Sequence, residues 1–220
     1  RAIPGVIDTL TSHSEVSMKA HMDGAGPEDD FRVKFDPKKV IREALDALKR
    51  PKFLAIVASN VLALTLAKKA SGKVDGFIVE GPTAGGHNAP PRGEKVFNDL
   101  GEPVYGPKDE VNLEDLKKLG LPFWLAGSFG EPEKVKQSLE QGAAGVQVGT
   151  AFAYCEESGM AEFIKDRVIE KALAGEASIF TDATASPTGF PFKVVNIEGT
   201  LSDPKEYEIR QRSCTLGYLR

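Results

Sequence analysis

The sequence contains only two cysteines among its 220 residues, Cys155 and Cys214, and they lie far apart in the chain. Neither belongs to a CxxC motif, and two cysteines at this separation do not make a disulfide framework. So few cysteines are typical of proteins from reducing compartments. We therefore expect a cytoplasmic protein.

Long hydrophobic runs and an excess of basic residues are also missing. The longest apolar stretch, residues 53–67, is interrupted by Ser59, Asn60 and Thr65 and is shorter than the ~20 residues that span a bilayer. The 28 lysines and arginines are interspersed with 32 acidic residues. We expect neither a membrane span nor a nucleic-acid partner. The first residues have no signal-peptide layout and do not begin with Met, so we expect a chain that was cut or processed at its start.

Histidine is scarce as well, with three residues in the chain. None of them belongs to an HxH, HxxxH or Cys/His cluster, so we predict no metal site. The sequence has no GxSxG elbow, no P-loop and no GxGxxG that precedes a helix. The sequence therefore gives no motif for a serine hydrolase, a P-loop NTPase or a Rossmann dinucleotide site.

What the chain does contain is an alternation of short apolar runs with helical patterns. The runs predict strands at residues 16–20, 52–58, 74–80, 122–127 and 144–150. Helices are predicted at residues 36–48, from 59 to about 67, 112–119, 132–141 and 160–174, with Asp36 and Ser59 in N-cap positions. The alternation is typical of an α/β fold with a parallel sheet. We count five βα units.

Five units do not close a (β/α)8 barrel, which needs eight strands. One interpretation is an open, doubly wound sheet. The other is a (β/α)8 TIM-barrel fold of which this chain holds only the later five units. We expect residues 1–175 to form the partial barrel and residues 176–220 to form a C-terminal extension or lid, because that tail has turn residues and one short strand-like run.

Three glycine-bearing loops follow predicted strands, at the end where parallel sheets bind ligands. The first loop contains Ala84, Gly85, Gly86 and His87, and the second contains Gly127 and Ser128 before a helix. Gly149 and Thr150 follow the next strand. Free backbone N–H groups and a helix N-terminus favour anion binding at the last two loops. An imidazole beside paired glycines can exchange a proton near neutral pH.

In order and spacing, "AGGH", "LAGS" and "GVQVGTAF…EES" resemble the nitronate monooxygenases, which are FMN-dependent TIM barrels. The related flavin-dependent enoyl-acyl-carrier-protein reductases share the same three motifs. The resemblance implies that the chain corresponds to barrel strands four to eight and to the segment after them. It also implies an enzyme that oxidises nitronates or nitroalkanes with oxygen.

The resemblance assigns roles to the loop residues. Ala84, Gly85 and Gly86 would lie along the flavin, and His87 would be the catalytic residue that faces the small-molecule substrate. Gly127, Ser128, Gly149 and Thr150 would form the phosphate cradle. Two positions depart from the family. Ser128 replaces a glycine, and Ala58 and Ser59 stand where many members have a lysine.

Other functions remain open at the level of sequence. The chain is also compatible with a flavin-dependent enoyl-thioester reductase or with a flavin- or phosphate-binding module without turnover. A phosphosugar barrel would use Lys19 or Glu80, the only obvious strand-end candidates for such chemistry. We expect either a homo-oligomer or a partner that supplies the missing N-terminal half-barrel. As a fragment, the chain would leave the edges of strands 16–20 and 144–148 unpaired.

Overall fold

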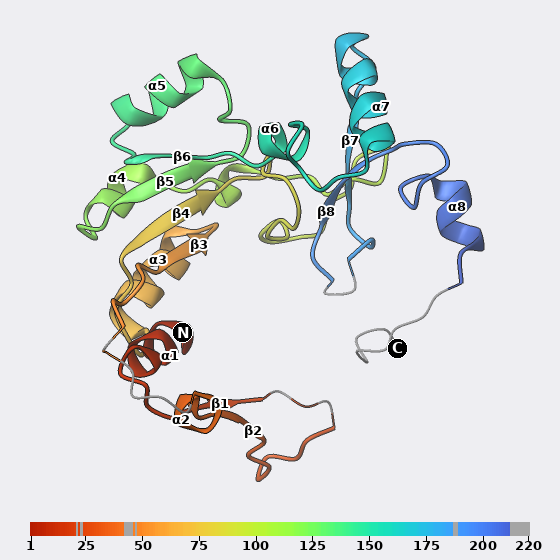
Figure 1. Ribbon diagram of the computed structural model, residues 1–220. Coiled ribbons are helices and arrows are strands. Elements are labelled where there is room, and N and C mark those ends of the chain that lie inside the picture. The colour runs from red at the N-terminus through yellow and green to blue at the C-terminus, as the bar shows by residue number, and fades with distance from the viewer. Residues whose placement is uncertain (21, 23, 42–45, 47, 187–188, 212–220) are drawn as a thin grey trace. The chain divides into compact units, whose positions relative to one another are not determined.

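The computed structural model describes residues 1–20, 22, 24–41, 46, 48–186 and 189–211. The chain forms two compact units, whose elements are drawn in Figure 1. The first unit consists of Arg1–Ile78 and Leu113–Pro122, and the second consists of Val79–Asn112 and the chain from Phe123 onward. All residues predicted for the site lie in the second unit.

Four strands are hydrogen-bonded in the order β3 (Leu54–Val57), β4 (Gly76–Glu80), β5 (Phe123–Ala126) and β6 (Gly145–Gln147). The β5 and β6 strands run parallel, and their register places Ala126 opposite Gln147. Most side chains of β4 and β5 are buried, with Phe77 completely inaccessible to solvent. Near-continuous burial is typical of parallel strands covered on both faces. The α/β class with a parallel sheet is therefore confirmed.

The helices between and after these strands lie where the sequence predicts them. They are α3 (Asn60–Lys69), α4 (Leu113–Lys117), α5 (Pro132–Glu140) and α7 (Glu162–Leu173). The Ser59 hydroxyl accepts the N–H of Leu62 at 3.2 Å, and the Asp36 carboxylate accepts the N–H of Lys38 at 3.0 Å. Both N-caps are confirmed. Asp36 caps the short helix α2 (Pro37–Val40); residues 42–45 and 47 of the predicted helix 36–48 lie outside the described part of the chain.

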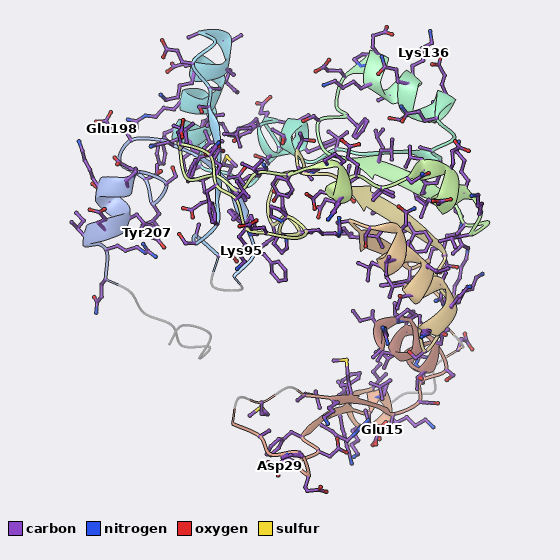
Figure 2. The ribbon with its side chains drawn as sticks, turned by 180° about the vertical axis from the view of Figure 1, so that it is seen from behind. Glu15, Asp29, Lys95, Lys136, Glu198 and Tyr207 are labelled. Atoms are coloured by element: carbon purple, nitrogen blue, oxygen red, sulfur yellow. The ribbon has the colours of Figure 1, made fainter. Side chains whose placement is uncertain are left out.

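Helix α5 carries a charged, solvent-facing side. Figure 2 shows its side chains, Lys136 among them, standing out from the ribbon. Lys136 and Glu133 are exposed, whereas Ser138 is completely buried. The run of Lys and Glu residues is thus a solvated helix face, because charged side chains lose hydration when they are buried without partners.

The first predicted strand does not belong to the parallel sheet. Strand β1 (Val16–Lys19) pairs antiparallel with β2 (Arg32–Phe35), which the sequence analysis missed. Val16 and Met18 lie opposite Phe35 and Val33, and the polar residues alternate with them. The Gly- and Pro-containing segment between the strands allows this hairpin turn. The count of five βα units was wrong in this respect, and the parallel sheet begins at β3 instead of at this strand.

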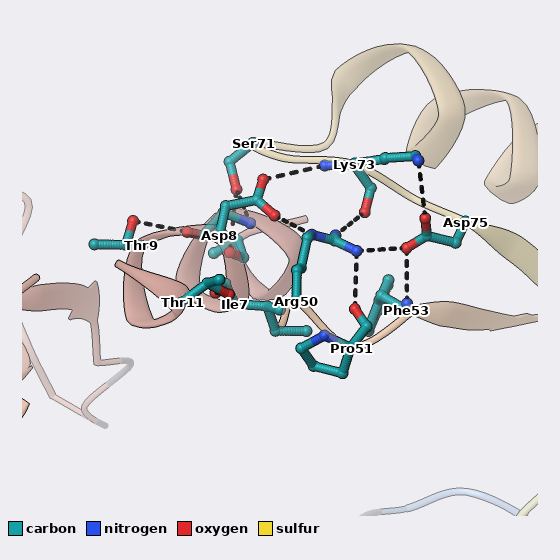
Figure 3. Close-up of polar contacts among 12 residues, drawn as sticks. Ile7, Asp8, Thr9, Thr11, Arg50, Pro51, Phe53, Ser71, Lys73 and Asp75 are labelled. Atoms are coloured by element: carbon teal, nitrogen blue, oxygen red, sulfur yellow. Dashed lines mark hydrogen bonds and ion pairs between the residues drawn. The ribbon is translucent and has the colours of Figure 1, made fainter. Parts of the chain in front are cut away.

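An arginine in the first unit joins three segments of chain, as Figure 3 shows. The Arg50 guanidinium donates to Asp8 of α1 (Ile3–Thr11) and, at 2.6 Å, to Asp75 just before β4. Asp75 also accepts the N–H of Phe53 at 2.8 Å. This backbone hydrogen bond, together with Arg50, lowers the pKa of Asp75 to about 2. The hydrogen bond from Arg50 likewise lowers the pKa of Asp8.

The tail forms a second antiparallel hairpin in place of the single predicted run. Strand β7 (Ile179–Asp182) pairs with β8 (Phe192–Val195), and helix α8 (Pro204–Ile209) follows. The N–H of Thr181 donates to the Glu102 carboxylate at 2.8 Å. Glu102 belongs to the long loop after β4, which also holds the 3-10 turn η1 (Pro107–Asp109). The hairpin is thereby anchored to that loop. The division into residues 1–175 and 176–220 stays a prediction.

No helix in the described residues is long and apolar enough to cross a membrane.

Candidate functional site

The three glycine-bearing loops begin at the carboxyl ends of adjacent strands. Gly81 follows β4, and its N–H donates to the carbonyl of Ala126, the last residue of β5, at 3.3 Å. Because Ala126 is opposite Gln147, the loops after β5 and β6 start side by side. Parallel sheets bind ligands at this end.

The loops also touch each other beyond the strand ends. A Cβ atom built on Gly127 would lie 2.8 Å from the Ala84 nitrogen and 2.8 Å from the Thr83 Oγ1. Similarly, a Cβ atom on Gly85 would lie 4.0 Å from Thr150 Oγ1. The loop that contains Gly85 therefore packs against the Gly127 loop and approaches Thr150, and only a residue without a side chain fits at position 127.

Gly127 and Ser128 both have left-handed backbone conformations, with φ of +108° and +59°. Left-handed φ is unstrained for glycine and costs about 1 kcal/mol or more for other residues. Ser128 therefore has a strained backbone, at the position where the family resemblance implies a glycine. The conformation turns the chain at the end of β5 ahead of helix α5.

Gly149 and Thr150 start a new short helix directly after β6. Gly149 is the N-cap of α6 (Thr150–Ala153), and its carbonyl accepts the N–H groups of Phe152 and Ala153, both at 3.0 Å. Gly149 and Thr150 are both exposed, and no heavy atom would lie within 4 Å of a Cβ atom on Gly149. The first N–H groups of a helix have no partner within the helix, so they are available to an acceptor.

His87 is exposed and lies against the tail hairpin. Its Nε2 atom is 2.6 Å from the Ser186 hydroxyl oxygen. Its ring meets the Phe192 ring edge to face, with centroids 4.7 Å apart. Neither contact was predicted from the sequence: Ser186 lies 99 residues further along the chain, and no local pattern connects two such distant residues. For the segment that contains both residues, the sequence predicted only a C-terminal extension or lid.

Asn88 was not among the predicted site residues, and Glu80 was considered only for phosphosugar chemistry. Asn88 is 3% exposed, and its amide donates to the Ala84 carbonyl at 3.0 Å. Among the described protein groups, its Oδ1 atom has no hydrogen-bond partner. Glu80, at the end of β4, is half-buried. Burial raises the pKa of Glu80, and the nearby His87 opposes that shift.

Lys19, a candidate for phosphosugar chemistry, lies on the β1 strand of the antiparallel hairpin. It is therefore not at the end of a parallel strand, and it gives no support to that alternative. Ser59, which stands where the family resemblance implies a lysine, acts as a helix cap. In the described part of the chain, no three His, Cys, Asp or Glu residues are placed to hold a metal ion.

Comparison with known proteins gives a family. The family model described as nitronate monooxygenase matches residues 32–184. A Staphylococcus haemolyticus protein named "Probable nitronate monooxygenase" is 30% identical over 129 residues, which is 58% of this chain and 34% of that protein.

A second relative comes from Mycobacterium tuberculosis and is named "(3aS,4S,5R,7aS)-5-hydroxy-7a-methyl-1-oxo-octahydro-1H-indene-4-carboxyl-CoA dehydrogenase". It is 28% identical over 145 residues, which is 66% of this chain and 36% of that protein. The solved structure of FabK from Thermotoga maritima aligns with a TM-score of 0.44 and 22% identity, over 66% of this chain and 39% of FabK.

The chain thus spans about a third of the length of the curated relatives that it matches. The matched region includes β3 to β6 and all three glycine-bearing loops, and it ends within the tail. Since the family model covers more than half of the 220 residues, the chain belongs to the nitronate monooxygenase family.

Proposed function

We propose that this chain is the phosphate-binding and substrate-facing part of a cytoplasmic FMN-dependent oxidoreductase that oxidises nitronates or nitroalkanes with oxygen. One observation carries the proposal. In a member of the nitronate monooxygenase family, three glycine-bearing strand-end loops meet, and one of them presents an exposed histidine.

The residues of the three loops fit the phosphate group of FMN. Gly149 and Thr150 offer N–H groups at an exposed helix start, and Gly127 and Ser128 turn beside them at the adjacent strand end. Backbone N–H groups at such positions stabilise an anion. Ala84, Gly85 and Gly86 would lie along the flavin ring. The buried, unpartnered Oδ1 atom of Asn88, close to these residues, supports a polar ligand nearby because such an acceptor is costly when it stays unpaired.

FMN, when bound, supplies the two-electron chemistry, and the protein orients the substrate and manages protons. His87 would accept the proton from the α-carbon of a nitroalkane, and the electron pair of that C–H bond would stay on the nitronate. The imidazolium formed in this step would be stabilised by the Glu80 carboxylate, since the charge of His87 opposes the rise in the pKa of Glu80 that burial causes. A nitronate substrate needs no proton removal, and there His87 would stabilise the anion.

The test begins with cofactor binding. The purified chain is titrated with FMN, and quenching of flavin fluorescence gives the Kd. We expect Gly149→Val to weaken FMN binding by at least about 10-fold, since a side chain there would occupy the space in front of the helix start.

Gly106→Val is the matched control. Gly106 also has no heavy atom within 4 Å of a built Cβ and has an extended φ of −134°. We expect it to leave the Kd unchanged. Equal FMN affinity in the wild type and both variants would refute the phosphate site.

Activity is measured next as oxygen consumption with nitronate as substrate. The CoA dehydrogenase name of the Mycobacterium tuberculosis relative favours a second candidate, an oxidoreductase that acts on a thioester, such as an enoyl-thioester reductase. Oxidation of NAD(P)H that depends on an enoyl thioester, without oxygen consumption on nitronate, would favour this alternative. FMN binding without turnover on either substrate would instead indicate a flavin-binding module.

A further inference from the structure

The tail hairpin forms backbone hydrogen bonds with the residues before and after His87. The N–H of Lys193 donates to the Gly86 carbonyl at 3.0 Å, and the N–H of Asn88 donates to the Pro191 carbonyl at 2.8 Å. His87 itself lies opposite Phe192 in an antiparallel bridge. In such a pair, with the hydrogen bonds on the flanking residues, the two side chains lie close together on one face.

The side chain of His87 is held by the same hairpin region. The edge-to-face contact with Phe192, at an interplanar angle of 78°, limits rotation of the ring. The Ser186 hydroxyl engages Nε2 at 2.6 Å. The contact occupies Nε2, and Nδ1 can act as a base when the ring proton is on Nε2.

We propose that Ser186 is a positioning residue for His87: its oxygen accepts the proton of Nε2–H, which leaves Nδ1 as the base. This inference rests on the function proposed above. In the neutral ring, Nε2–H donates to the Ser186 oxygen, and the Nδ1 lone pair accepts the proton from the α-carbon of the substrate. After the transfer, Nε2–H keeps the same hydrogen bond, so the ring does not have to reorient during the step.

The first test needs no turnover. Nuclear magnetic resonance of the full chain, labelled in its histidine ring nitrogens, reports the tautomer, and His87→Asn assigns the His87 signals among the three histidines. We expect the proton of the neutral wild-type ring on Nε2. Ser186→Ala should give signals averaged between the two tautomers, and Ser186→Thr should restore the wild-type signals because it keeps the hydroxyl.

Ser202→Ala is the matched control in the tail. The Ser202 hydroxyl accepts the N–H of Ile197 at 3.0 Å, so its loss weakens the tail through a different hydrogen bond. We expect it to lower the thermal stability and to leave the His87 signals unchanged. The positioning role is overturned if Ser186→Ala leaves the His87 ring signals as they are in the wild type, or if Ser202→Ala changes them equally.

The second test uses the FMN-loaded protein with a nitroalkane substrate. We expect Ser186→Ala to lower kcat on the order of 10-fold, with a smaller change in KM and bound flavin, and Ser186→Thr to recover most of the loss. If the wild type shows the expected tautomer but no turnover, the proposed function fails while the positioning of the ring by Ser186 stands. If turnover is present and the ring signals do not depend on Ser186, the positioning role fails alone.

Discussion

At the scale of single residues, His87 connects two parts of the second unit. Its loop carries the glycines that touch the other strand-end loops, and its ring contacts Phe192 and Ser186 of the tail. A purely structural histidine would also be held in this way. A substitution must therefore separate packing from acid–base chemistry.

His87→Asn makes this separation. The predicted phosphate site lies on other loops, so we expect FMN content to stay nearly unchanged. We expect turnover per bound flavin with nitroalkane or nitronate to fall by ~10²–10⁴-fold, the range typical for loss of a general acid or base. Turnover per flavin and thermal stability are measured together. Normal turnover with lowered stability or flavin content would show that His87 is only structural.

Ser128 gives a second prediction at this scale, now on stability. Because its φ is +59°, Ser128→Gly should relieve backbone strain and raise the free energy of unfolding by about 1 kcal/mol. Ser178→Gly is the control, since Ser178 is exposed and is not among the described residues with positive φ. Chemical denaturation compares the two variants. Destabilisation by Ser128→Gly equal to that by Ser178→Gly would contradict the strain.

At the scale of elements, charged hydrogen bonds fasten helix α1 to the segments that lead into β3 and β4. Arg50 reaches Asp8 and Asp75, and it also donates to the carbonyls of Pro51 and Lys73 at 2.9 and 2.6 Å. Asp75 is nearly inaccessible and accepts from both the side chain of Arg50 and the backbone of Phe53. The carboxylate thus stabilises the fold more strongly in its charged form.

The pH dependence follows from the lowered pKa of Asp75. The pKa of Asp75 is 3.8 in the unfolded chain and lower in the folded protein. The carboxylate therefore contributes stability at pH values above 3.8, and this contribution is lost as the pH falls toward about 2. We expect Asp75→Asn to cost about 2 kcal/mol at neutral pH, since it removes charged hydrogen bonds. Its stability should then fall less than that of the wild type between pH 4 and 2. Thermal unfolding measured across this range checks the expectation, and parallel curves for the two proteins would contradict it.

At the scale of the whole molecule, the four-stranded sheet ends at β3 and β6 within the described residues. The chain spans about a third of its curated relatives, and the barrel of the family has eight strands. Unpaired strand edges attract other strands. We therefore propose that the chain self-associates or takes up a partner through these edges.

A charge on the edge strand tests this association. Ile56 lies on β3 and is 53% exposed. We expect Ile56→Lys to reduce concentration-dependent self-association in sedimentation velocity, because lysine on an edge strand disfavours strand pairing. Val61→Lys is the control, on the exposed surface of helix α3 at 75% exposure. If both variants associate like the wild type, the edge of β3 does not mediate the contact.

The sequence by itself determined the local elements of this protein. Apolar runs gave the four parallel strands, Asp36 and Ser59 gave two helix starts, and glycine gave the three loops after the strands. These features depend on side-chain periodicity and backbone freedom within a few residues, so they can be predicted locally. The family resemblance rested on the same loops, and the family match confirmed it.

Only the tertiary structure decided which segments meet. Residues 16–19 have the pattern of a strand, and they do form one. They are outside the parallel sheet because they pair with β2 in a hairpin, which their composition does not reveal. Ser186 and Phe192 became neighbours of His87 because residues 191 and 193, at the start of β8, hydrogen-bond to residues 88 and 86. A strand can pair with any free edge of suitable register, and a single sequence does not specify that edge when the partners are a hundred residues apart.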